Sequence, residues 1–467
     1  MLGRRQTVKT ISQRIAEFIE RTSPGRIPAA VCEIAKLHLL DGLATMLGGA
    51  REESARLLCH HYVRLRGKEE ASVLGTSIRL PAEQAALING IQGHVLDYDD
   101  AQLTTSASRP MGQQTHPTSP VLAALLALAE SQQANGSALL ASYIVGVEVA
   151  CRLGDAIDPS HYLDGFHPTG TLGAFGAAAA CAHLLKLKPA SIRHALGIAG
   201  TLSSGLRANR GTMAKGLNAG RAAENGLLAA KLAASGFTAS ENIFDEPMGF
   251  FSAACRNKVD RKLLRFGRPF FFTKPGVGIK LYPCAGVLHP AIDLLLRLQQ
   301  RYALAPERIK TISVTLDANA ALPLVYHRPN DALQAKFSLP FAVAVTLADG
   351  AAGLRQFSSA RVRDPKLHKL MKRVELHERS GDRRSIGIDT QVEIATQHGV
   401  IHGGRDWIAS GHPARPATHA QIKEKFHQCA DGVLPGPTIA KFLETFGSLE
   451  RTPSITAWLS LLRSSQH

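Results

Sequence analysis

The amino-acid sequence predicts a mainly α-helical protein, made of a large all-helical domain with a smaller α+β domain inserted into it. Three observations lead to this prediction. Apolar residues recur with helical spacing up to about residue 270, they alternate as in strands within residues 307–399, and the helical spacing returns after residue 408. The chain of 467 residues is long enough for two domains. We expect a helical domain of residues 1–274 and 409–467, and a smaller domain of residues 275–408.

The predicted helices of the large domain begin and end at residues that favour helix ends. The segment 28–49 opens with a proline and closes with two glycines, and the segment 81–97 also opens with a proline. Four further segments have helical spacing: residues 120–136, 137–154, 170–187 and 220–237. They are rich in alanine and glycine, so we expect the helices to approach one another closely.

The smaller domain is predicted from a change of pattern near residue 275. Apolar residues alternate within 307–319 and again within 387–399, which is typical of strands. Helical segments at 335–350 and 365–374 lie between them. A junction between two domains is a common place for a small-molecule site.

The cysteine pattern and the net charge of +16 restrict the classes of function. The seven cysteines lie far apart without metal-ligand spacing, which argues against structural zinc and iron–sulfur clusters and favours reduced thiols in the cytoplasm. No apolar run approaches the roughly 20 residues of a membrane helix, and residues 1–20 are expected to form an amphipathic helix of the fold. The basic run 355–384 lacks aromatic residues and is interpreted as a solvated face. Nucleic-acid binding by this run is the alternative of a different class; we expect neither nucleic acid nor a membrane as a partner.

Reactive side chains gather in five short loop segments. The first holds three carboxylates, Asp97, Asp99 and Asp100, and ends at Thr115 and His116. Carboxylates so close together repel one another unless positive charge lies nearby. The other four segments offer such charge, together with tyrosines: His167; Arg207, Arg210 and Lys215; Lys280, Tyr282 and His289; and Tyr326, His327 and Arg328.

These residue types favour chemistry on an anionic organic acid. The sequence contains no Gly-x-Ser-x-Gly, Walker or His-Glu-x-x-His motif. Lysines and arginines can hold carboxylates, while His, Lys or Tyr can move protons. Structural interpretations stay open as well: His116 and His167 could satisfy buried carbonyl groups, Lys215 could be an exposed loop lysine, and Tyr326 could be a core residue.

Six phrases in order along the chain resemble the MmgE/PrpD family, which includes 2-methylcitrate dehydratase, cis-aconitate decarboxylase and iminodisuccinate epimerase. They are "NGIQGHVLDYDD", "THPTSPVLAALLALAE", "FHPTGTLGAFGAAAA", "GTMAKGLNAGRAAENGLLAAKLAASGFT", "GIKLYPCAGVLHPAID" and "YHRPNDALQAKFSLPFAVAVTLADG". The resemblance implies a helical domain that forms a homodimer, an α+β lid over a cleft, and catalysis without a metal or an organic cofactor.

The resemblance also implies which residues form the site. The family's site positions fall on Asp97, His116, His167, Lys215, Lys280 and Tyr326. Relatives such as the decarboxylase carry Thr where this chain has Ala101, and their following loop is shorter. In this chain Thr104, Thr105, Ser106 or Arg109 could serve in place of that Thr.

The expected reaction removes a proton from the carbon next to a carboxylate. Lys215, Lys280 and Arg207 or Arg210 would stabilise the charge that builds up, with Thr115 and Thr104 as further substrate contacts. His116 or His167 would carry the proton, Tyr326 would donate a hydrogen bond, and Asp97 would orient a histidine or the loop. We rank dehydration of a di- or tricarboxylic acid first and epimerisation second, and decarboxylation is the remaining outcome.

Overall fold

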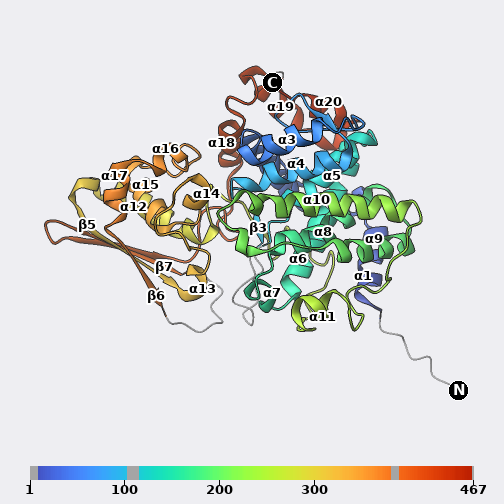
Figure 1. Ribbon diagram of the computed structural model, residues 1–467, viewed down its shortest axis with the longest axis horizontal. Helices are drawn as coiled ribbons and strands as arrows, with labels where there is room; N and C mark the ends of the chain where they lie inside the picture. Colours follow the sequence, from blue (N-terminus) through green and yellow to red (C-terminus); the bar gives the residue numbers. More distant parts are fainter. Residues whose placement is uncertain (1–8, 103–114, 380–388, 465–467) are drawn as a thin grey trace.

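The computed structural model describes residues 9–102, 115–379 and 389–464 and is mainly α-helical, as predicted (Figure 1). The larger part consists of helices packed in layers. They are α1 (Ile11–Arg21), α2 (Ala29–Gly49), α3 (Glu53–Val63), α4 (Ala82–Val95), α5 (Thr118–Ser131), α6 (Gly136–Ala156), α7 (Ser160–Leu163), α8 (Pro168–Leu184), α9 (Pro189–Leu202), α10 (Met213–Ala234) and α11 (Phe250–Cys255). Two short strands, β1 (Ala71–Ser72) and β2 (Arg79–Leu80), pair antiparallel beside them.

Small side chains allow the central helices to touch through their backbones. A Cβ atom on Gly90 of α4 would lie 2.8 Å from the Cα atom of Gly220 on α10. One on Gly226 would lie 2.4 Å from the Cβ atom of Ala177 on α8. Real Cβ atoms do not approach so closely, so larger residues at these glycines would push the helices apart. The close approach expected from the alanine and glycine content is therefore present.

Helix α6 is long and apolar enough to cross a membrane by length and composition, contrary to our expectation from the sequence. In the structure almost all of its residues are buried, and it packs on α5 and α8 (Figure 1). Protein therefore surrounds this helix, and its apolar character is explained by its place in the core.

The smaller part contains a four-stranded sheet with the order β6-β5-β7-β8. The strands are β5 (Ile309–Asp317), β6 (Val374–Arg379), β7 (Thr390–Thr396) and β8 (Ile401–Asp406). Strand β6 runs parallel to β5, and β7 and β8 continue antiparallel. Helices α12 (His289–Tyr302) and α15 (Leu339–Asp349) pack on the sheet, and α17 (Pro365–Met371) packs on α15 (Figure 1). The predicted strands β5 and β7 are confirmed, whereas β6 and β8 were not predicted because their sequences are mostly polar.

The apolar residues form two separate clusters. One contains residues between 11 and 279 together with residues 422–462, and the other contains residues 284–394. The last helices, α18 (His419–Ala430), α19 (Gly436–Phe446) and α20 (Ile455–Ser460), thus return to the helical part. The clusters separate close to the expected domain boundaries; the boundaries themselves and the role of the smaller part as a lid stay predictions.

The basic run expected to be a solvated face is described up to Arg379. Within this part, Arg361 pairs with Asp349 and Asp364, and Arg379 pairs with Asp389. Several of its arginines are thus engaged in local ion pairs, which supports the interpretation as a solvated face.

Candidate active site

A cavity enclosing about 690 Å³ of space, part of it open solvent, is lined by residues of both the helical part and the smaller part. Its lining joins polar residues of the helical part to apolar residues of the smaller part: Asp97, Ala101, His116, Tyr162, His167, Leu206, Arg207, Arg210, Lys215, Lys280, Ala285, Gly286, Val287, Pro323 and Phe337. The volume is in the range of sites for small organic molecules.

The cavity brings together most of the ten residues that the sequence analysis assigns to the expected reaction. Seven of these ten line it: Asp97, His116, His167, Arg207, Arg210, Lys215 and Lys280. Two do not. The Tyr326 hydroxyl donates a hydrogen bond to the backbone carbonyl of Arg210 at 2.8 Å, and Thr115 is buried behind the cavity. Thr104, Thr105, Ser106 and Arg109 lie outside the described residues. The catalytic roles of all these residues stay predictions.

Asp97 is held between two lysines. Its Oδ1 atom lies 2.7 Å from Lys215 Nζ and 3.3 Å from Lys280 Nζ, and Lys280 also donates to the Asp97 carbonyl at 3.0 Å. Burial by itself raises the pKa of Asp97, but the two ammonium groups outweigh it and hold the pKa well below its usual range. Asp97 is therefore a carboxylate that gathers both lysines at the cavity.

His94, a residue that the sequence analysis missed, links Lys215 to a second carboxylate. Its Nδ1 atom lies 2.8 Å from Asp99 Oδ2, and its Nε2 atom lies 2.9 Å from Lys215 Nζ. Burial lowers the pKa of His94 to about 4, so the ring is neutral near pH 7. Because a carboxylate can only accept, Nδ1 carries the proton and Nε2 accepts from Lys215. His94 thus fixes Lys215 as a donor.

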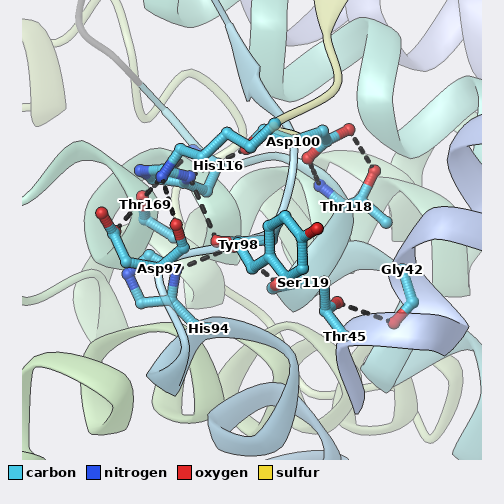
Figure 2. A network of polar contacts seen from close by, with 12 residues as sticks. Gly42, Thr45, His94, Asp97, Tyr98, Asp100, His116, Thr118, Ser119 and Thr169 are labelled. Atoms are coloured by element: carbon cyan, nitrogen blue, oxygen red, sulfur yellow. Dashed lines mark hydrogen bonds and ion pairs between the residues drawn. The ribbon is translucent and has the colours of Figure 1, made fainter. Parts of the chain in front are cut away.

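His116 presents an acceptor to the cavity. Its Nδ1 atom lies 2.8 Å from the Asp100 carbonyl oxygen and 3.4 Å from Asp99 Oδ1, so Nδ1 is the protonated nitrogen (Figure 2). In the neutral ring, Nε2 is then left with a free lone pair. The backbone N–H of His116 donates to Thr169 Oγ1 at 3.1 Å, which ties this residue to helix α8.

His167 presents a donor. It is the N-cap of α8, followed by Pro168 as predicted from the sequence. Its Nδ1 atom accepts from the Asn218 side-chain amide at 3.1 Å, which places the proton of the neutral ring on Nε2. Burial, and then the neighbouring His94 and Lys215, hold the pKa of His167 well below its usual range.

Two arginines and two aromatic rings complete the lining. The Arg207 guanidinium lies 3.5 Å from the centre of the Tyr162 ring and donates to the Tyr162 carbonyl, while its Nε atom has no hydrogen-bond partner among the residues that the structure describes. Phe337, from the smaller part, faces both Lys215 and Arg210, at 5.5 Å and 5.7 Å from its ring centre. A cation beside an aromatic ring is stabilised while it keeps donors for an anion.

The three neighbouring carboxylates noted in the sequence are each compensated separately. Asp97 has its lysines, Asp99 accepts from His94 and from Ser119 Oγ at 2.7 Å, and Asp100 accepts from Thr118 at 2.5 Å (Figure 2). Figure 2 shows Asp97 and Asp100, from the loop after α4, close to Thr118 and Ser119 at the start of α5. The three carboxylates thus hold the surrounding lysine, histidine and hydroxyl groups in position through hydrogen bonds.

His94, Asp99 and His116 are also close enough to hold a metal ion, since one ligand atom from each lies within 4.8 Å of the others. The hydrogen bonds described above use the same atoms. Both Nδ1 atoms face acceptors and must carry protons, whereas a metal ligand nitrogen must be free of its proton. The arrangement therefore fits a hydrogen-bonded network better than a metal site.

Acid should destabilise the protein between pH 6.5 and about 4. Burial lowers the pKa of His94, His161 and His289 to about 4, below the usual 6.5. In this range the unfolded chain binds protons that the folded chain does not, so stability falls as pH falls. Asp41 has the opposite effect, because burial raises its pKa to about 6 and the folded chain then binds a proton that the unfolded chain lacks. The three histidines together outweigh this single group. We expect the thermal unfolding midpoint to drop from pH 7 to pH 4.5, and to drop less in His161→Gln; an unchanged midpoint would contradict the assignment.

Comparison with known proteins agrees with the resemblance noted in the sequence. Residues 13–262 match the MmgE/PrpD N-terminal domain, and residues 282–448 match the MmgE/PrpD C-terminal domain. The chain is 26% identical to cis-aconitate decarboxylase of Homo sapiens, over 98% of this chain and 95% of the relative. It is 26% identical to cis-aconitate decarboxylase of Aspergillus terreus, over 97% and 96%. It is also 26% identical to a cis-aconitate decarboxylase-like protein of Aspergillus oryzae, over 97% of both chains. The chain therefore belongs to the MmgE/PrpD family.

Proposed function

We propose that this chain is a decarboxylase that releases CO₂ from a small unsaturated tricarboxylic acid, with cis-aconitate as the leading candidate. The observation that carries the proposal is the charge of the cavity lining. Four cationic side chains and one carboxylate line it, which gives a net charge of +3 before the histidines are counted. This charge matches the three carboxylates of such a substrate.

Similarity to cis-aconitate decarboxylases over nearly the whole chain supports decarboxylation over the dehydration that the sequence analysis ranks first. Dehydration of 2-methylcitrate has support only at the level of the family. The homodimer and the closing of the smaller part over the cavity, both implied by the resemblance, belong to the same proposal.

The reaction needs a place for negative charge. In a β,γ-unsaturated acid the bond to the departing carboxylate breaks, its electrons form a new double bond, and the former double bond delivers its electrons to the carbon beside a retained carboxylate. That carbon then takes up one proton. Fixed cations around the retained carboxylate lower the barrier, because charge builds up where they already lie.

The side chains suit distinct parts of this step. Lys280, Arg207 and Arg210 hold carboxylates, and the Lys215 ammonium delivers the proton. Burial lowers the pKa of Lys215, which makes it a stronger acid than an exposed lysine. His167 Nε2–H donates to a carboxylate oxygen. His116, with its free Nε2, takes up from solvent the proton that replaces the one delivered by Lys215.

The direct test incubates the purified protein with cis-aconitate and measures CO₂ release together with the product by proton NMR. We expect one CO₂ per product molecule and a product with a terminal methylene group. Citrate and 2-methylcitrate are tested in parallel for formation of a conjugated double bond by ultraviolet absorbance. Double-bond formation from a hydroxy acid without CO₂ would establish dehydration instead, and no reaction with any acid would refute both.

Replacing Arg207 with glutamine should mainly weaken substrate binding. A hydrogen bond to a charged partner contributes about 1.5–3 kcal/mol, so kcat/KM should fall roughly 10- to 100-fold, mostly through a higher KM. Steady-state kinetics with cis-aconitate measures this. Arg256→Gln is the matched control, because that arginine is largely exposed and has only a long ion pair with Asp164. Equal effects of the two changes would argue against a role of Arg207 in binding.

A further inference from the structure

A lysine that does not line the cavity contacts the backbone of the segments that carry the charged residues of the cavity. Lys425, on the C-terminal helix α18, is 2% exposed. Its ammonium group donates to the backbone carbonyls of Tyr98 at 2.6 Å and Lys280 at 2.9 Å, and lies 2.5 Å from Asp41 Oδ1. It also lies 3.8 Å from the centre of the Tyr98 ring.

The two carbonyls belong to the two segments that carry the central ion pair of the site. Tyr98 directly follows Asp97, and Lys280 is itself the second lysine of the cavity. The Lys280 side chain returns to the Asp97 carbonyl at 3.0 Å, and the Tyr98 hydroxyl donates to the Leu281 carbonyl at 3.2 Å. Lys425 therefore holds the backbones of both segments without itself lining the cavity.

The strain in one of these segments makes such support necessary. Asp97 has a φ of 51°, in the left-handed region that residues other than glycine seldom adopt. Such a conformation costs about 1 kcal/mol or more and persists where the surroundings enforce it. The carbonyl next to it along the chain, that of Tyr98, is one that Lys425 binds.

Burying a lysine in this place has no evident benefit for stability alone. The desolvation of a buried ion pair often cancels its attraction, and apolar residues of the same volume can stabilise a fold as well. The partner of Lys425 on helix α2, Asp41, accounts for the ion pair. It does not account for the two carbonyl contacts.

We propose that Lys425 is a positioning residue. It sets the distance between Asp97 and Lys280, and thereby whether the Lys215 side chain keeps its proton. Lys425 is not among the described residues that line the cavity. We infer that it acts through these two segments. The inference rests on the proposed function, since it assigns Lys425 to the same site.

The chain offers a way to separate this role from a purely structural one. Asp41→Asn removes the ion pair but keeps both carbonyl contacts, while leaving a buried cation without its counter-charge. The double variant Asp41→Asn/Lys425→Met removes the cation as well, together with the carbonyl contacts. The first variant should therefore be the less stable of the two, and the second the less active.

The experiment measures the unfolding midpoint, kcat, KM and the pH–rate profile of both variants with cis-aconitate. We expect Asp41→Asn to lower the midpoint and keep kcat within about threefold of wild type. The double variant should unfold at a higher temperature than Asp41→Asn. Its kcat should be lower by roughly 10- to 100-fold, with the basic limb of its profile moved to lower pH. The proposal would be overturned if the less stable variant, Asp41→Asn, were also the less active one. It would also be overturned if the basic limb of the double variant did not move.

Two further measurements keep the inference testable. If the methionine double variant does not fold, Asp41→Asn/Lys425→Leu, whose side chain also has no donor for the two carbonyls, takes its place with the same criteria. If wild-type protein releases no CO₂, the proposed function fails, and the inference is tested with the saturated tricarboxylate tricarballylate by calorimetry. Its dissociation constant should then be at least tenfold higher for the double variant than for Asp41→Asn, and equal constants would refute the positioning role.

Discussion

Replacing Lys215 with methionine should reduce kcat for CO₂ release by a factor of about 10³ or more. The change removes the proposed proton donor and one of the four cations of the cavity, and loss of a single preorganised electrostatic contact costs about 10²–10³ in kcat. The methionine keeps most of the volume of the lysine stem, and Asp97 keeps its contact with Lys280. The fold should therefore survive. Single-turnover CO₂ release and circular dichroism measure the two effects separately.

The same helix supplies a control for this change. Lys231, also on α10, is 40% exposed and pairs with Glu83 at 2.6 Å, away from the cavity. Lys231→Met alters the charge of the protein equally but should leave kcat within about twofold of wild type. A Lys215→Met variant with more than a tenth of wild-type activity would remove Lys215 from the mechanism.

Replacing Asp97 with asparagine should be the second most damaging change, with kcat lower by roughly 10²–10³-fold. Asparagine tolerates the left-handed backbone conformation nearly as well as aspartate, so the loop geometry should be kept. The loss is electrostatic. The Asp97 carboxylate raises the pKa of Lys215 against the effect of burial, and without it Lys215 gives up its proton more readily. A neutral lysine can neither hold an anion by charge nor deliver a proton.

The pH–rate profile distinguishes this explanation from misfolding. Since the protonated form of Lys215 persists only at lower pH in Asp97→Asn, the basic limb should move toward acid, and part of the activity should return there. The matched control is Asp389→Asn, which removes a carboxylate from an ion pair with Arg405 on the sheet of the smaller part. An unshifted limb in Asp97→Asn would contradict the coupling between the two residues.

The sequence predicts the helices well because their signals are local. Pro28 and Pro81 precede α2 and α4, and apolar spacing identifies the rest. The strands β6 and β8 are not predicted from the sequence, because only a few of their residues face the core, as in the segment Val374–Arg379. The pairing partner of β6, β5, lies about 60 residues earlier along the chain, whereas β8 follows its partner β7 directly, so for β8 the polar sequence alone hides the strand.

The candidate site is predictable in its residue types but not in its roles. Lys215 and Lys280 stand among glycines in the sequence and Asp97 stands in a cluster of carboxylates, which marks them as candidates. The structure then places Lys215 in the first turn of α10 and not in a loop. His94 looks like an ordinary helix residue until the fold places Asp99 and Lys215 on its two nitrogens. Likewise, the Asn218 amide reveals that His167 is a donor, and the Asp100 carbonyl reveals that His116 is an acceptor. Tautomers depend on partners that sequence spacing cannot supply.

The contact between Gly211 and Tyr326 joins the two parts of the molecule at the rim of the cavity. Gly211 has a φ of 76°, and a Cβ atom there would lie 2.4 Å from the Tyr326 ring. Any side chain at 211 would therefore displace the ring that closes over it. In evolutionary terms, descendants that keep an aromatic residue at 326 should keep glycine at 211, and glycine should persist at 211 even where residue 326 changes, because the positive φ alone strains any other residue there.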